Sequence, residues 1–183
     1  MKKFLKWFGG FVALILLSQV FFYWQATRSP QWEYARRALE CKEPNYDLTY
    51  CVDLPASDRK DFTNSSFKPL VCINTASSCY NYRHRAGNCN SLKAHPDRWS
   101  FREVSASEAV PGDLMLFVTD TGRAPHAGVY TMNSILGPLC ANTIGFGIFF
   151  HYMPIKPIMW LRVARTQYTH VKYYRYYGES VRE

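Results

Sequence analysis

Several common signatures of function are missing from this 183-residue sequence. None of its six cysteines belongs to a CxxC pair, which argues against the usual zinc sites and thioredoxin-like redox motifs. No glycine-rich phosphate loop is present, because Gly145-Phe146-Gly147 lacks the strand-to-helix context of such loops. There is no repeat of fixed period and no low-complexity tract, so a solenoid or a disordered array is not expected.

Acidic residues are scarce as well: 14 Asp and Glu stand against 22 Lys and Arg, which gives a net charge of +8. No pair of carboxylates has a setting that suggests glycoside cleavage. The basic residues are scattered rather than blocked, so we interpret the charge as a general surface bias and expect no nucleic-acid partner. The tyrosines between residues 168 and 177 fit strand packing and surface positions better than a nucleobase-stacking platform.

Hydrophobic residues are abundant, at 48% of the chain, and aromatic residues make up 16%. Such a sequence can build a real core without a metal or an organic cofactor, and we expect neither. The length suits one domain plus a targeting segment.

The N-terminus contains the longest apolar run. Lys2, Lys3 and Lys6 precede an uncharged stretch from Trp7 to Trp24, close to the lower limit for crossing a bilayer. The exit at residues 22–26 is bulky, unlike a small-x-small cleavage site, so an uncleaved anchor is favoured over a cleaved signal peptide. Lysines stay on the cytoplasmic side, which predicts an inner-membrane protein anchored through residues 4–24 with its C-terminal domain in the periplasm.

After this anchor (residues 1–28), we expect a helix and a cover loop (29–68) and then the main domain (69–183). Helices are predicted over 31–41, after Ser29-Pro30, and over 72–86, before Gly87. Gly137-Pro138 suggests a loop. Strands are predicted over residues 114–118, 126–130, 148–153, 160–164 and 171–177. One cysteine-bearing helix followed by a strand meander is an α+β arrangement.

An exported domain with six cysteines predicts disulfide bonds. Cys41 and Cys51 bracket a short loop and form one plausible bridge. Cys79–Cys89 and Cys89–Cys140 are alternatives for a second bridge, and the sequence leaves the connectivity open.

The residues also permit cysteine-based catalysis. A helix start lowers the pKa of a thiol, a histidine completes its activation, and a third polar group orients the imidazole. The sequence offers Cys72 at a predicted helix start, His126 at the start of a strand and His151 on the following predicted strand. Antiparallel neighbouring strands would place the two histidines side by side.

The segment Pro111-Gly112-Asp113-Leu114, followed by His126-Ala127-Gly128-Val129-Tyr130, resembles the NlpC/P60 family of papain-like peptidoglycan peptidases. The resemblance covers about residues 70–165. It implies a nucleophile helix packed on an antiparallel β-meander and a cysteine peptidase that cleaves amide bonds in the stem peptides of peptidoglycan.

The resemblance also implies roles for residues. His126 would be the base and His151, in Phe149-Phe150-His151, its orienting partner, with Asn142 as an alternative. The family's Asp-Cys-Ser-Gly tetrapeptide is absent. Spacing to the downstream motif favours Cys72 as nucleophile, and Cys79 is the alternative.

Two other hypotheses about the function remain open. A disulfide-stabilised envelope protein that binds cell wall or a partner without catalysis would explain the missing tetrapeptide. An acyltransferase or deamidase would use the same residues. The sequence leaves the oligomeric state open.

Overall fold

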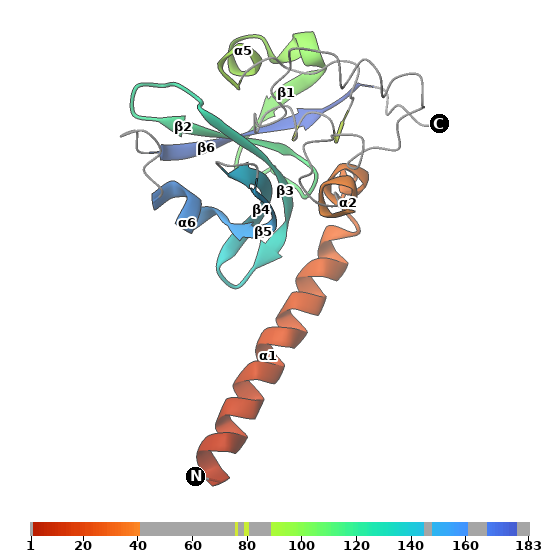
Figure 1. The fold of residues 1–183 in the computed structure, drawn as a ribbon. Helices are drawn as coiled ribbons and strands as arrows, with labels where there is room; N and C mark the ends of the chain where they lie inside the picture. Colours follow the sequence, from red (N-terminus) through yellow and green to blue (C-terminus); the bar gives the residue numbers. More distant parts are fainter. Residues whose placement is uncertain are drawn as a thin grey trace.

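The computed structural model describes residues 2–40, 76, 79–80, 89–144, 148–160 and 168–178. They form an α+β arrangement in which one antiparallel sheet carries short helices on both faces, and one long N-terminal helix extends away from it (Figure 1). The cover loop at 42–68 lies outside the described residues, as do Cys41, Cys51 and Cys72.

Helix α1 (Lys2–Ala26) is the apolar segment that the sequence singled out. Its stretch Trp7–Ala26 is long and apolar enough to cross a membrane, with a mean hydropathy of 1.6 and none of that window buried against the domain. Helix α2 (Trp32–Glu40) follows after a short turn and confirms the helix predicted over 31–41. Ser29 caps this turn, because its Oγ accepts a hydrogen bond from the Gln31 backbone N–H (3.1 Å).

The sheet contains six strands in the order β1-β6-β2-β3-β4-β5, and every neighbouring pair is antiparallel. The strands are β1 (Phe101–Val104), β2 (Leu114–Thr119), β3 (His126–Ser134), β4 (Gly137–Ile144), β5 (Ile148–Pro154) and β6 (Tyr168–Tyr176). Further helices in the described ranges are α5 (Cys89–Ala94), the 3-10 helix η2 (Pro96–Trp99) and α6 (Ile155–Trp160).

Side chains on the two faces of the sheet form two separate cores. On the first, which we call the α2 face, Leu114, Leu116 and Val118 of β2 pack with residues of α2 and α5. On the second, the α6 face, Met115 and Phe117 pack with residues of α6 and β6. The alternation follows from the two-residue period of a strand, and β2 is buried along its whole length because both faces are covered.

Aromatic rings make up much of the α2 face. Tyr80 packs against Tyr34, Phe101 and Tyr176, with ring centroids 4.8, 4.9 and 5.5 Å apart. Since Tyr34 lies on α2 and Tyr176 on β6, this cluster joins segments far apart in the sequence. Most of the C-terminal tyrosines are buried and Tyr177 is exposed, which agrees with the predicted strand packing and surface.

Several strand predictions are confirmed and others need correction. Strands β2, β3, β5 and β6 lie where strands were expected. Gly137 and Pro138, predicted as a loop, begin β4, because proline is tolerated near a strand end where its missing N–H breaks few ladder bonds. Trp160, predicted to start a strand, ends α6, and residues 161–164 lie outside the described part of the chain.

The predicted bridges Cys79–Cys89 and Cys89–Cys140 are wrong. In the described part of the chain, Cys79, Cys89 and Cys140 are buried thiols rather than disulfides. Cys89 packs on the α2 face and Cys140 on the α6 face, so the sheet separates those two sulfurs. The predicted Cys41–Cys51 bridge lies outside the described residues.

Candidate functional site

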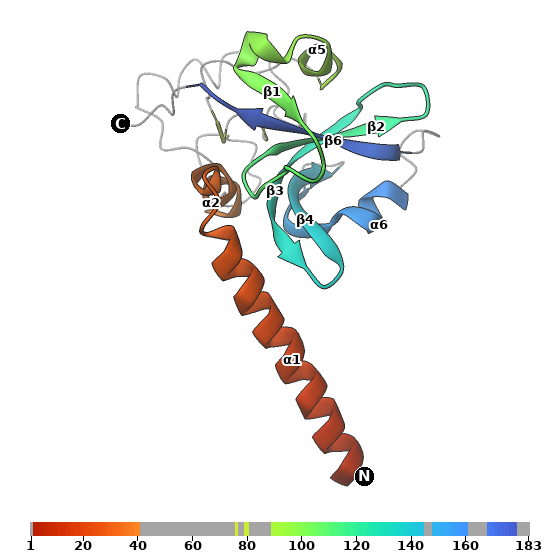
Figure 2. The same ribbon diagram turned by 180° about the vertical axis from the view of Figure 1, so that it is seen from behind.

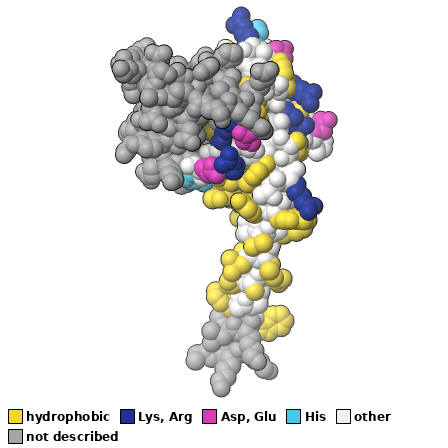
Figure 3. All heavy atoms as spheres, turned by 90° about the vertical axis from the view of Figure 1, so that its right-hand side faces the viewer, with side chains coloured by type: hydrophobic (Ala, Val, Ile, Leu, Met, Phe, Trp, Pro, Cys, Tyr) yellow, Lys and Arg dark blue, Asp and Glu magenta, His cyan; other side chains and the backbone are white. Residues whose placement is uncertain are grey.

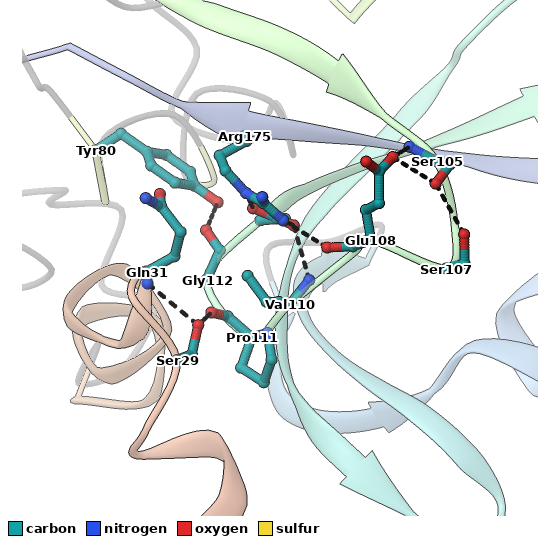
Figure 4. Close-up of polar contacts among 11 residues, drawn as sticks. Ser29, Gln31, Tyr80, Ser105, Ser107, Glu108, Val110, Pro111, Gly112 and Arg175 are labelled. Carbon is teal, nitrogen blue, oxygen red and sulfur yellow. Dashed lines mark hydrogen bonds and ion pairs between the residues drawn. The ribbon is translucent and has the colours of Figure 1, made fainter.

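The first half of the family-like motif, Pro111-Gly112-Asp113, is a turn that holds several segments together (Figure 4). The Tyr80 hydroxyl donates a hydrogen bond to the Gly112 carbonyl (2.7 Å), and the Ser29 hydroxyl donates one to the Pro111 carbonyl. Gly112 has φ +100°, and a Cβ there would overlap the Gln31 backbone carbonyl. Only glycine fits a position that combines a left-handed backbone with so close an approach.

Asp113 in this turn is fully buried and paired with Arg175 on β6. The guanidinium contacts both carboxylate oxygens, with Nε to Oδ1 at 3.1 Å and Nη2 to Oδ2 at 3.0 Å. The Val110 backbone N–H donates to the same Oδ2 (2.8 Å), and the hydrogen bond to Asp113 raises the pKa of Arg175. A buried carboxylate satisfied in this way has a structural role, because its acceptor positions are occupied by the protein.

The second half of the motif begins at His126, the first residue of β3, and lies at the other end of the β2–β3 pair. His126 lies opposite Phe117, whereas Val129 lies opposite Leu114, next to the Asp113 turn. The half-buried imidazole lies between two rings of the α6 face, with centroids 5.1 Å from Phe117 and 6.2 Å from Tyr168.

Asn142 on β4 fixes the orientation of this imidazole. Its Oδ1 lies 3.2 Å from His126 Nε2 and, being a carbonyl oxygen, accepts the Nε2–H hydrogen bond. The Asn142 amide N–H donates in turn to the Cys140 carbonyl (3.4 Å), which sets which end of the amide faces the histidine. A neutral imidazole that donates from Nε2 keeps a lone pair on Nδ1, so Nδ1 is the basic position.

Gly128 makes this close pairing of β3 and β4 possible. A Cβ at Gly128 would overlap the Cys140 sulfur and lie 2.7 Å from the Ala141 carbonyl oxygen. The glycine two residues after His126 therefore admits the Cys140 side chain and brings Asn142 within reach of the imidazole.

The sequence predicted His151 beside His126, but β4 separates the strands that carry them. His151 is half-buried on β5, and its ring lies 6.4 Å from that of Tyr152. The structure thus joins His126 to Asn142, the alternative orienting residue. The sequence signal was present in the length of the segment between the two histidines, which has room for one further strand.

Cys79, the alternative nucleophile, is buried on the α2 face, whereas the His126 ring packs on the α6 face. Burial raises the pKa of its thiol from 9.0 to about 12, against the lowering effect of Arg37, whose guanidinium donates to the Cys79 carbonyl (3.1 Å). A thiol in this setting is protonated near neutral pH. Cys72, the preferred candidate, lies outside the described residues.

Within the ranges that the structure describes, no three His, Cys, Asp or Glu side chains are grouped so that they could hold a metal ion. The His126–Asn142 pair can act as an oriented base or as a hydrogen-bonding site.

Comparison with known proteins yields little. No family model matches the chain, and no curated protein matches it. Among solved structures, a similar chain comes from the type VI native effector–immunity complex Tae3–Tai3 of Ralstonia pickettii. The identity is 15% and the TM-score 0.31, with 81% of this chain and 100% of the other covered, a similarity too low to identify a family.

Proposed function

We propose that this protein is a membrane-anchored cysteine hydrolase that cleaves amide bonds in the stem peptides of peptidoglycan. His126, oriented by Asn142, is the base, and Cys72 is the nucleophile. Helix α1 crosses the inner membrane, and the domain lies in the periplasm, where its substrate is found.

The observation that carries this proposal is the hydrogen bond between His126 and Asn142 at the start of β3. An imidazole oriented by an amide is the pair that papain-like peptidases combine with a cysteine. The pair lies on β3 and β4, which approach closely because Gly128 has no side chain. This close approach explains why a glycine stands two residues after His126.

The proposed reaction has two steps. The Cys72 thiolate attacks the peptide carbonyl, and the imidazolium of His126 gives its Nδ1 proton to the departing amine, which leaves a thioester. His126 then takes a proton from water, and the resulting hydroxide attacks the thioester. The acid product leaves, and the Cys72 thiolate is regenerated beside the His126 imidazolium. Asn142 accepts the Nε2–H hydrogen bond throughout and so keeps Nδ1 directed at the reacting atoms.

The nucleophile is tested by comparing Cys72→Ala with Cys79→Ala in the full-length protein, with purified muropeptides as substrate. We expect Cys72→Ala to lose hydrolysis. Cys79→Ala is the matched control and should keep the parent rate per folded molecule, because its thiol is buried and protonated. A Cys72→Ala protein as fast as the parent would exclude Cys72 as the nucleophile.

The second candidate function is a non-catalytic envelope protein that binds cell wall or a partner. The burial of Cys79, the alternative nucleophile, and the raised pKa of its thiol favour this alternative, because a protonated thiol is a poor nucleophile. Alkylation of the native protein near neutral pH separates the two functions. One rapidly modified cysteine at position 72 supports the enzyme, whereas the absence of any reactive thiol supports the binding protein.

A further inference from the structure

The hairpin that joins β3 to β4 ends in an apolar turn. Its two central residues, Ile135 and Leu136, are 58% and 60% exposed. Two-residue hairpin turns usually hold Asn, Asp or Gly, because these residues adopt the left-handed backbone conformation that such turns require and are well solvated by water. Adjacent exposed Ile and Leu at such a tip indicate an apolar environment.

Three polar groups of this turn are paired within the hairpin. The Leu136 backbone N–H donates to Ser134 Oγ (3.1 Å), and the Ser134 hydroxyl donates to the Gly137 carbonyl (2.8 Å). Removing such groups from water is less unfavourable than removing unpaired ones. The tip therefore combines exposed apolar side chains with polar groups that are partly paired within the hairpin.

The base of the hairpin is packed onto the end of α1. Met132 of β3 and Leu139 of β4 form a buried cluster with Ala26 at the C-terminal end of α1, and Trp32 packs against it. Figures 1 and 2 both show the tip pointing to the side of the domain toward which α1 runs. Because the packing is fixed, the tip has a set position relative to α1.

Aromatic side chains surround this junction. Tyr23 and Trp24 near the end of α1 are 47% and 48% exposed, and the Arg28 guanidinium lies over the Trp24 ring, 3.5 Å from its centroid. Tyr152 on β5 is 52% exposed, and burial together with Tyr23 raises the pKa of its hydroxyl. Figure 3 shows hydrophobic side chains following α1 up to the domain. Tyrosine, tryptophan and arginine are typical of the bilayer–water interface.

We propose that the tip of the β3–β4 hairpin inserts Ile135 and Leu136 into the outer leaflet of the same bilayer that α1 crosses. The domain then rests on the membrane in one orientation. This inference rests on the proposed membrane anchoring. A stable protein interface needs roughly 1,000 Å² of buried surface, whereas a protruding two-residue tip beside a membrane helix suits lipid.

The orientation has a consequence for the site. His126 and Ser134 are the two ends of β3, which is nine residues long. At roughly 3.3 Å per residue they lie about 26 Å apart along the strand. The hairpin tip would thus hold His126 at the end of β3 remote from the bilayer, facing the cell wall.

Photocrosslinking of the full-length protein tests the inference. The protein carries p-benzoyl-phenylalanine in place of Leu136 and is reconstituted in vesicles of phosphatidylethanolamine and phosphatidylglycerol. We expect a mass shift equal to one added phospholipid on the peptide that contains position 136. Tyr177, 54% exposed beyond the end of β6, is the matched control and should give no lipid adduct.

Phe21 in α1 is the second control, and it separates the two proposals. A lipid adduct at position 21 without one at position 136 would overturn the hairpin contact and leave the anchor standing. No adduct at either position would overturn both. A crosslink from position 136 to another polypeptide, including a second copy of this chain, would also overturn the lipid contact. Adding Ile135→Asp should strongly reduce the adduct at position 136.

Discussion

The two ends of the β2–β3 strand pair differ in what they contribute. At one end, Asp113 is completely buried, and Arg175 and the Val110 backbone N–H occupy its oxygens. At the other end, His126 is half-buried and bonded through Nε2, with Nδ1 as its basic position. The two halves of the motif thus differ, because residues 111–113 belong to a buried and hydrogen-bonded turn, whereas His126 is the proposed base. The predictions below test this division.

The largest effect is expected for His126→Ala. If His126 is the base, hydrolysis falls by roughly 10²–10⁴-fold, the usual contribution of a positioned acid–base group. Thermal stability should fall modestly, because the ring is half-buried and its removal takes one hydrogen-bond partner from the buried Asn142. His170→Ala is the matched control, since His170 is exposed on β6, and its hydrolysis rate should equal that of the parent. Equal losses in both variants would contradict the role of His126.

At the other end of the strand pair, Asp113→Ala should act on stability rather than on chemistry. It leaves the Arg175 guanidinium without its partner, and breaking a buried pair costs about 3–5 kcal/mol. Urea unfolding measures this loss. The control is Glu103→Gln, which breaks the more exposed Lys172–Glu103 pair (2.7 Å) and should cost less than about 1 kcal/mol. Similar losses in the two variants would contradict the structural role of Asp113.

Asn142→Ala should lower hydrolysis by less than the roughly 10²–10⁴-fold that the base itself contributes, because the imidazole remains but loses its orientation. The fall should appear in kcat with little change in KM. His151→Ala is the comparison variant. A larger loss for His151→Ala than for Asn142→Ala would restore His151 as the orienting residue.

Gly128→Ala should destabilise the junction of β3 and β4. The added methyl group overlaps the Cys140 sulfur, and overpacking of this kind costs about 1–3 kcal/mol. Cys140→Ala in the same chain should recover part of the loss, which makes the two changes non-additive. Recovery will be incomplete, because the Ala141 carbonyl oxygen also lies close to the new methyl group. Strict additivity would contradict this packing.

The effect that is smallest near neutral pH concerns Cys79, because it appears only at alkaline pH. Burial raises the pKa of its thiol from 9.0 to about 12, so between these values the unfolded chain loses the proton while the folded chain keeps it. Stability therefore falls as pH rises through this window, by at most about 1.4 kcal/mol per pH unit for one thiol. Buried tyrosines such as Tyr130 act in the same direction. Cys79→Ala should reduce the slope of unfolding free energy against pH, and an unchanged slope would contradict the raised pKa.

Local patterns predicted much of this fold. Hydrophobic runs and helix caps depend on neighbours in sequence, so the elements that they mark could be predicted. These elements are the apolar helix α1, the helix after Ser29-Pro30, and the strands around residues 114–118 and 126–130. Strand β4 was missed, because Gly137-Pro138 has the composition of a loop and a strand that follows a tight hairpin turn can still begin there.

The sequence by itself determined the α+β class, the apolar N-terminal helix and His126 as the leading residue of a strand, since each depends on local pattern. Only the tertiary structure decided that Asn142 is hydrogen-bonded to His126 and that Asp113 forms an ion pair with Arg175. It also decided that Cys79 packs on the opposite face of the sheet from the His126 imidazole. The physical reason is strand pairing: register and the face of the sheet decide which distant side chains meet, and both depend on the whole sheet.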